Sequence, residues 1–287
     1  MNRQIKKQAA FTLIELVMVI VILGIVSVGI SGFIGSSTQI FVDTTERDQL
    51  LSDSRFAVSR LNRELRNAVP SSIRISASTS AHCIEFTPIE WSTFYLDIPV
   101  ESTESGDSAE VVALVDIDGQ HYAISGDEYA IVYPTGTDDI YDATESRRFQ
   151  ISTCEDDGSN TSCTNVSGPA NVTTLNFTDS SALFAADSPR NSMYIATEAI
   201  SYCVRDDGNL YRHSDGFNVT QTNHTSGGIL MGQNIVNTLS ATIDSDSPFV
   251  LSNATLNLNA LVRVLLRFER NDEIVEFNYE TNVANVP

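Results

Sequence analysis

A long apolar run, FTLIELVMVIVILGIVSVGISGFI, occupies residues 11–34 and constrains the fold more than any other part of the sequence. As an α-helix, a run of this length extends roughly 36 Å, enough to cross a hydrocarbon core of about 30 Å. One carboxylate, Glu15, lies near its start. An ionised group at membrane depth is costly and usually functional. The run therefore predicts a membrane-spanning helix with an acidic residue that needs an explanation.

The charges on either side of the run predict its orientation. Arg3, Lys6 and Lys7 precede it, and the first charge after it is Asp43. The positive-inside rule places the N-terminus in the cytoplasm and the bulk of the chain on the far side of the membrane. A cleaved secretory signal has a shorter apolar core that ends in a small-x-small site, for which only a weak "SVG" match exists. A plain single-span anchor explains the length and orientation, but it does not explain Glu15.

The remainder of the chain is strongly acidic. The sequence has 37 acidic and 17 basic residues, a formal net charge of −20, and lysine only at positions 6 and 7. Such a surface repels nucleic acid and anionic lipid and favours solubility. We therefore expect no nucleic-acid partner.

Four cysteines all lie beyond the apolar run, and their spacing matches no zinc signature. An even number of cysteines on the far side of a membrane segment indicates disulfides formed in an oxidising compartment. Sequence alone permits three connectivities. We favour Cys154 with Cys163, because the segment between them is a polar loop, which leaves Cys83 with Cys203. Free buried thiols are the alternative.

Residues 35–69 are expected to continue the helix in amphipathic form. The segment after Ser37 lacks proline and glycine, and its apolar residues recur at steps of seven, three, four and three: Leu51, Val58, Leu61, Leu65 and Ala68. This spacing is typical of a helix with one buried face. Pro70 is expected to end the helix. Glycines at positions 24, 29, 32 and 35 predict bending or local melting in the preceding half.

After Pro70, short β-branched and aromatic runs replace the helical period. Strands are expected at 83–89, 93–100, 111–117, 129–135 and 148–153. Two hairpins are expected, one turning at DDGN (206–209) and one at Asn271–Asp272. Polar inserts at 101–110 and 154–170 are expected to form surface loops. The predicted fold class is α+β, with one long helix packed on an antiparallel sheet.

No catalytic constellation is visible, so we expect a protein that is not an enzyme. The four histidines, His82, His121, His213 and His224, form no ligand pair, and no nucleophile or phosphate-binding motif occurs. No cofactor is expected.

Two further features have an alternative interpretation. The acidic turns at 116–119 and 244–247 suit Ca²⁺, but neither completes an EF-hand loop, and ordinary turns account for both. Trp91, Phe94 and Tyr95 would suit a sugar-binding platform, but an aromatic core explains them equally simply.

The segment AFTLIELVMVIVILGIV resembles the N-terminal motif of type IV prepilins, a family of pilins, minor pilins and type II secretion pseudopilins. The resemblance implies that a prepilin peptidase cuts between Ala10 and Phe11 on the cytoplasmic side and then methylates the new amino group of Phe11. In this family a glycine usually precedes the cut. Ala10 departs from that pattern, but it is still a small residue.

The resemblance also implies a role for Glu15 as the fifth residue of the mature chain. In a filament core that holds little water, a carboxylate needs a partner. The amino terminus of a neighbouring subunit, at its Phe11, has the matching charge. Glu15 would then set the register between staggered helices.

Later segments resemble a narrower group, the minor pilin-like proteins of the MSHA-type pilus (the MshO group). They are CIEFTPI, ISYCVRDDGNLYRHSDGF and the C-terminal VLLRFER and EIVEFNYETNVANVP. The implied pilin-like domains are a leader (1–10), a transmembrane and filament-core helix (11–34), an amphipathic helix (35–69) and a β-rich periplasmic domain (70–287).

The same resemblance implies a location and a set of partners. The protein would reside in the bacterial inner membrane with its C-terminal domain in the periplasm, and would then enter a pilus. Its partners would be the prepilin peptidase, other major and minor pilins through the N-terminal helix, and the inner-membrane assembly platform. Assembly initiation or a tip complex is the implied role. A tip adhesin and a GspJ-like pseudopilin remain as alternatives.

Overall fold

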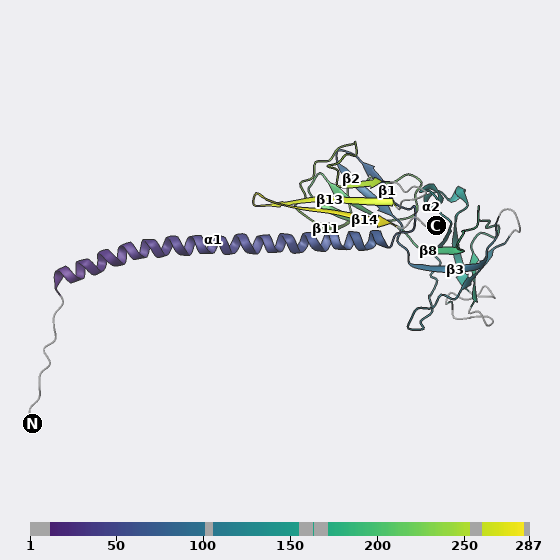
Figure 1. Cartoon of the computed structure of the whole chain (residues 1–287), viewed down its shortest axis with the longest axis horizontal. Coiled ribbons are helices and arrows are strands. Elements are labelled where there is room, and N and C mark those ends of the chain that lie inside the picture. Colours follow the sequence, from purple (N-terminus) through teal and green to yellow (C-terminus); the bar gives the residue numbers. More distant parts are fainter. Residues whose placement is uncertain (1–11, 101–105, 155–162, 164–171, 253–259, 284–287) are drawn as a thin grey trace, which may run out of the picture. The chain divides into compact units, whose positions relative to one another are not determined.

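A computed structural model describes residues 12–100, 106–154, 163, 172–252 and 260–283 (Figure 1). The chain divides into two compact units, residues 1–52 and 53–287, and each is described by itself. The expected processing site, Ala10–Phe11, lies outside the described residues.

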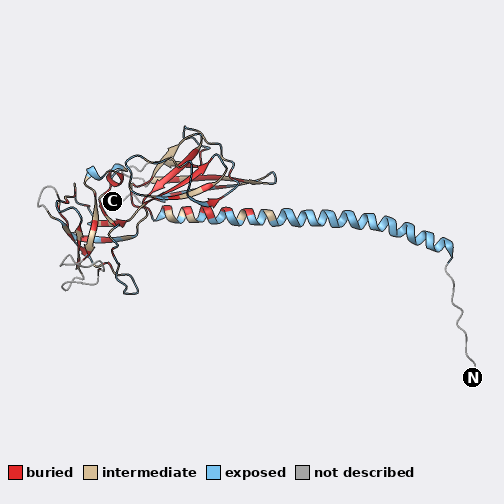
Figure 2. Cartoon of the chain, turned by 180° about the vertical axis from the view of Figure 1, so that it is seen from behind, coloured by how far each residue is buried: buried red, intermediate tan, exposed pale blue. Residues whose placement is uncertain are grey.

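One 54-residue helix, α1 (Leu13–Arg66), contains both helical segments expected from the sequence. Its apolar part is solvent-exposed in the isolated chain (Figure 2). Among the described residues it is the one helix long and apolar enough to cross a membrane. The predicted local melting is wrong, because all four glycines at 24, 29, 32 and 35 lie in α-helix. The helix also ends before Pro70, since Ala68 leaves it to form a β-bridge with Pro88.

Several hydroxyl side chains in the first unit bond within the helix. Ser27, Ser31 and Thr38 each donate to the backbone carbonyl four residues earlier, at 2.6, 2.8 and 2.9 Å. Ser36 and Thr44 do the same, at 3.1 and 2.8 Å. These hydroxyls therefore need no partner outside their own helix.

The part of α1 in the second unit has the buried face that the sequence predicts. Ala57, Val58, Leu61 and Leu65 are buried. Phe56, off this stripe, is largely exposed. This alternation is visible as red and blue bands along the C-terminal part of α1 in Figure 2.

A polar cluster also joins this part of α1 to the sheet. The Glu64 carboxylate accepts hydrogen bonds from the Tyr202 hydroxyl at 3.0 Å and the Arg212 Nε at 3.1 Å. Arg60 donates to its other oxygen at 3.0 Å. Burial raises the pKa of Glu64, but the bonds from Arg60 and Arg212 outweigh it, so the pKa lies below its usual value.

The α+β class is confirmed, but the strands form three antiparallel groups rather than one sheet. A five-stranded sheet has the order β1 (Arg74–Ala77), β2 (Ala81–Phe86), β9 (Ala199–Arg205), β10 (Leu210–Asp215) and β11 (Ile229–Gly232). A three-stranded sheet has the order β12 (Phe249–Ser252), β13 (Ala260–Arg270) and β14 (Glu273–Val283).

The remaining strands close a barrel, in the order β3 (Trp91–Asp97), β4 (Ser108–Val112), β7 (Val172–Phe177), β6 (Arg148–Cys154), β5 (Tyr129–Val132) and β8 (Ser192–Ala196). Two short helices, α2 (Asp138–Tyr141) and η1 (Ala143–Glu145), connect β5 to β6. The barrel has its own apolar core, which includes Val111, Ile151, Leu175 and Ile195.

Two strand predictions are corrected in the barrel. The expected polar loop at 101–110 includes Ser108–Glu110, but these residues belong to β4, where Ala109 packs into the core and Glu110 faces outward. The strand expected at 111–117 ends at Val112, because residues 116–120 form a tight turn closed by Asp116 N to Gln120 O.

Both predicted hairpins are confirmed. β9 and β10 pair across residues 206–209, with Gly208 at a φ of 74°. β13 and β14 pair along their full length, and Asn271 and Asp272 have φ values of 52° and 62°. Two successive positive φ values are characteristic of a type I′ turn, in which asparagine and aspartate are tolerated.

The structure contains the two disulfides that the sequence analysis favours. Cys83 and Cys203 are direct cross-strand partners in β2 and β9. Cys154, the last residue of β6, is joined to Cys163. All four cysteines are buried.

Candidate functional site

The first candidate site is the amino-terminal end of α1, where Thr12 and Glu15 cap the helix reciprocally. The Glu15 backbone N–H donates to Thr12 Oγ1 at 3.4 Å. The Thr12 backbone N–H and hydroxyl each lie 3.2 Å from Glu15 Oε2, to which they donate. This pattern is a capping box, which satisfies backbone donors that the helix itself leaves unpaired.

The capping box gives Glu15 a local role that the sequence analysis missed, although the spacing Thr-x-x-Glu was there to be read. A carboxylate in the first turn also interacts favourably with the helix dipole. All the capping bonds use Oε2, and Oε1 accepts no hydrogen bond within the described residues. Glu15 can therefore cap its own helix and still accept a donor from another molecule.

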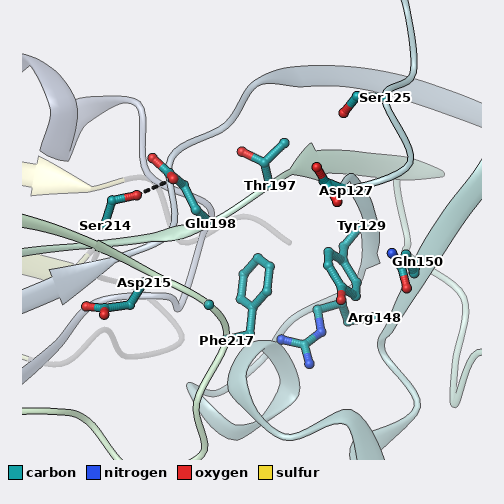
Figure 3. A pocket seen from close by; sticks show the side chains of 11 residues that line it. Ser125, Asp127, Tyr129, Arg148, Gln150, Thr197, Glu198, Ser214, Asp215 and Phe217 are labelled. Carbon is teal, nitrogen blue, oxygen red and sulfur yellow. Dashed lines mark hydrogen bonds between the residues drawn. The ribbon is translucent and has the colours of Figure 1, made fainter.

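A second candidate is a cavity of 550 Å³ in the second unit (Figure 3). Its lining comes from β5, β6 and the loop before β5, and from residues flanking β9 and ending β10: Ser125, Asp127, Tyr129, Arg148, Gln150, Thr197, Glu198, Ser214, Asp215, Gly216 and Phe217. Tyr129 pairs with Gln150 across β5 and β6, so both side chains lie on the same outer face of the barrel. No sequence motif joins these positions, and the sequence analysis singled out none of them.

Hydrogen bonds fix the loop on one side of this cavity. The buried Glu128 carboxylate accepts bonds from the backbone N–H groups of Ser125 and Gly126, at 2.9 and 2.8 Å. The Ser125 hydroxyl also donates to it, at 2.9 Å. Ser125 and Asp127 are therefore held at the cavity by a closed loop.

An ion pair fixes the opposite loop. Arg74 Nε lies 2.6 Å from the buried Glu85 carboxylate, and its terminal nitrogens donate to the carbonyls of Asn218 and Val219, both at 2.7 Å. These carbonyls immediately follow Phe217. The Phe217 ring is thereby placed edge-on to Tyr129, with centroids 5.1 Å apart.

Arg148 lies against both rings. Its guanidinium carbon is 4.3 Å from the Phe217 centroid and 4.9 Å from that of Tyr129. The residue is 8% exposed, and its Nη1 donates to the Ile140 carbonyl at 2.6 Å. Its Nε has no hydrogen-bond partner, and Arg148 forms no ion pair with a carboxylate among the described residues. Burial lowers the pKa of Arg148.

The structure brings together two of the histidines that are separated in sequence. His213 and His224 stack with their centroids 3.9 Å apart. Arg205 Nη2 lies 2.9 Å from His213 Nε2, and Asp215 lies 2.7 Å from His224 Nε2. Burial, together with His224 and Arg205, lowers the pKa of His213 to about 4. His82 and His121 lie elsewhere and bond to the carbonyls of Ser240 and Cys163.

The acidic turns are built on their own aspartates. Asp116 Oδ1 accepts from the N–H groups of Asp118 and Gln120, at 2.9 and 2.8 Å. Asp244 Oδ1 accepts from the N–H of Asp246, at 2.8 Å. In the described part of the chain, no three His, Cys, Asp or Glu side chains gather as metal ligands would.

The aromatic platform considered for Trp91, Phe94 and Tyr95 does not form. Tyr95 is buried and Trp91 packs against the barrel core, as the core interpretation predicts. Phe94 alternates with Tyr95 along β3, and it is 59% exposed on the outer side.

Comparison with known proteins identifies one similarity. Residues 5–31 match the prokaryotic N-terminal methylation motif. The match covers the expected processing site and Glu15 and extends into the apolar part of α1. Neither a curated protein nor a solved structure is significantly similar to the chain. The motif and the apolar helix that contains most of it indicate a type IV pilin-like or pseudopilin protein that is anchored in a membrane.

Proposed function

We propose that this chain is a minor pilin-like subunit of a type IV filament, without enzymatic activity. The observation that carries the proposal is the methylation motif at residues 5–31, which leads into the apolar segment of α1, where Glu15 is the one acidic residue before Asp43. A prepilin peptidase would remove residues 1–10 and methylate Phe11. The processed subunit would then leave the inner membrane, with its β-domain in the periplasm, and enter the filament.

The geometry at Glu15 supports a specific assembly step. Cleavage after Ala10 would create an amino terminus one residue before the capping Thr12. In a neighbouring subunit, that amine would approach Glu15, whose Oε1 is not used by the capping box. Both charges would leave water, so a misregistered subunit would bury an unpaired carboxylate, which is costly. The pair would therefore select one register.

The finer assignment is to the MSHA-type pilus, as a protein of the MshO kind that starts assembly or sits at the tip. Its support is the resemblance of CIEFTPI, ISYCVRDDGNLYRHSDGF and the C-terminal segments to this group, and the size of the β-domain, which would pack poorly along a shaft. Other pilins and the inner-membrane assembly platform would be its partners. The methylation motif suits a GspJ-like pseudopilin equally well. Deletion of the gene distinguishes the two assignments. Loss of pili with normal type II secretion would support the pilus assignment.

Processing can be tested by mass spectrometry of the mature chain. The expected product begins at Phe11 and is one methyl group heavier than the unmodified peptide. Because lysine occurs only at positions 6 and 7, the cleaved chain has a single amine, at its N-terminus. Amine-reactive labelling should therefore modify one site. A chain that retains Met1 would contradict the proposal.

The pairing role of Glu15 can be separated from its capping role. Glu15→Val removes both, whereas Thr12→Ala weakens the cap and keeps the carboxylate. We expect both variants to be cleaved, but only Thr12→Ala to enter filaments, as measured by immunoblotting of sheared pili. Equal loss in the two variants would mean that capping alone explains Glu15.

A tip adhesin is the second candidate, and the cavity in Figure 3 is the observation that favours it. The two functions differ on deletion of the gene. Loss of piliation supports a role in assembly, whereas normal numbers of non-adhesive pili support an adhesin.

A further inference from the structure

We propose that the cavity between residues 125–129, β6 and the segment 214–217 binds a neutral saccharide. This property goes beyond filament assembly and does not depend on it. The inference comes from the shape, the rigidity and the charge pattern of the cavity.

The cavity is large enough for a small sugar chain and is held open by the fold. Its volume is 550 Å³, within the range of ligand sites in proteins. The two loops that face each other are each fixed by a buried carboxylate, Glu128 on one side and Glu85 through Arg74 on the other. A ligand would therefore meet a preformed site and would not have to order it, which favours binding.

The charges disfavour an anionic ligand. Three carboxylates, Asp127, Glu198 and Asp215, line the cavity beside one cation, Arg148, so the charge of the lining is net negative. The whole chain adds a net charge of −20. An anion would therefore be repelled both at long range and within the cavity.

The charges also disfavour a cation. The buried guanidinium of Arg148 lies against Tyr129 and Phe217, so a second cation would be repelled from the rings that usually attract one. Glu198 already accepts a hydrogen bond from Ser214, and Asp215 lies 2.7 Å from His224. Of these three carboxylates, Asp127 is the one for which the described residues provide no hydrogen bond or ion pair.

A neutral polyhydroxyl ligand uses the groups that remain. Sugar hydroxyls donate to carboxylates and to the Gln150 amide oxygen, whose NH₂ group is bonded to the Gly126 carbonyl at 2.7 Å. They accept from the Thr197 hydroxyl and donate to the Ser125 hydroxyl oxygen, whose own proton is bonded to Glu128. The half-buried Phe217 ring adds apolar surface against which the C–H groups of a pyranose can pack. Figure 3 shows Thr197, Asp127 and Phe217 around the same space.

A glycan array with neutral, sialylated and sulfated members tests the proposal on the full-length protein in detergent. We expect signal on neutral glycans, with lower signal where a sialic acid or sulfate extends the same core. Titration calorimetry with the strongest neutral glycan then gives the dissociation constant. The absence of signal on every neutral glycan, or signal only on charged ones, would overturn the proposal.

Variants place the binding in this cavity. Asp127→Ala removes an exposed carboxylate without an internal partner, so the fold should be unaffected and the affinity should fall about tenfold for a lost hydrogen bond to a charged group. Asp138→Ala, at the start of α2 outside the cavity, is the matched control and should bind normally. A Phe217→Ala variant should also lose binding, with its fold checked by thermal melting. Unchanged affinity in both cavity variants would refute the site.

Discussion

Replacing Glu64 by alanine should loosen the attachment of α1 to the β-domain more than any single charge change elsewhere on the described part of this helix. The substitution removes the acceptor of Tyr202, a buried residue, and of Arg212. Arg60 loses its ion pair as well, but that pair spans one helical turn and is partly exposed.

The magnitude follows from these contacts. Hydrogen bonds to a charged group contribute about 1.5–3 kcal/mol each, and they are not additive when they share one acceptor. We therefore expect Glu64→Ala to lower the free energy of unfolding by about 3 kcal/mol. The Arg60→Ala control should lower it by less than about 0.5 kcal/mol, the value of an exposed pair four residues apart. Glu64→Gln keeps an acceptor for Tyr202 but removes the charge. Its loss of unfolding free energy should therefore lie between those of Glu64→Ala and Arg60→Ala.

Thermal unfolding of the full chain, followed by near-ultraviolet circular dichroism, measures these differences. For a unit of this size, a loss of about 3 kcal/mol lowers the Tm by roughly 6–12 °C. Since the pKa of Glu64 is lowered in the folded state, its contribution is complete above its ordinary pKa and is lost as the pH falls through the folded value. Equal Tm shifts for Glu64→Ala and Arg60→Ala would refute the reasoning.

Four other changes have defined outcomes. Because the pKa of His213 is lowered from 6.5 to about 4, stability should fall as the pH drops through this window, by at most about 1.4 kcal/mol per pH unit in urea titrations, and a flat profile would contradict it. Gly228→Ala should destabilise by more than about 2 kcal/mol in the same assay, since a Cβ there would lie 2.4 Å from His213 Nε2 at a φ of +87°, and a neutral effect would show that the ring can move. Replacing Cys83 and Cys203 by alanine should cost about 5 kcal/mol through the 120-residue separation that they close, whereas a smaller loss than for the other disulfide would count against the loop-entropy model. Leu61→Ala, in the buried face of α1, should cost about 2–5 kcal/mol, and a loss below 1 kcal/mol would mean that the face is not packed as described.

The sequence predicted the features that depend on neighbouring residues. The apolar run, the stripe through Leu61 and Leu65, and the turn at Asn271–Asp272 each follow from a local period or turn preference. The capping box at Thr12 and Glu15 was equally local. Its signal is the spacing Thr-x-x-Glu at the start of the helix.

The features that were not predicted depend on distant pairings. The barrel exists because β3 pairs with β8, about 100 residues later in the chain. The cavity joins residues 125–150 to residues 197–217. The stacking of His213 on His224 requires the chain to return after β10. A hydrophobic period reports only on neighbouring residues, so it does not predict contacts between residues that are far apart in the sequence. The cavity and the histidine pair could therefore not be predicted.

The intrahelical bonds of Ser27, Ser31, Thr38 and Thr44 have a consequence for how subunits of the proposed filament would recognise one another. A hydroxyl that already donates to its own backbone has no unsatisfied donor, so it does not require a hydrogen-bond acceptor on a neighbouring molecule. In the proposed filament, the apolar stretch of α1 could then slide and rotate against its neighbours with little polar penalty. Discrimination between correct and incorrect neighbours would rest on Glu15, near the start of the helix. The remainder of the stretch could then vary in sequence as long as it stays apolar.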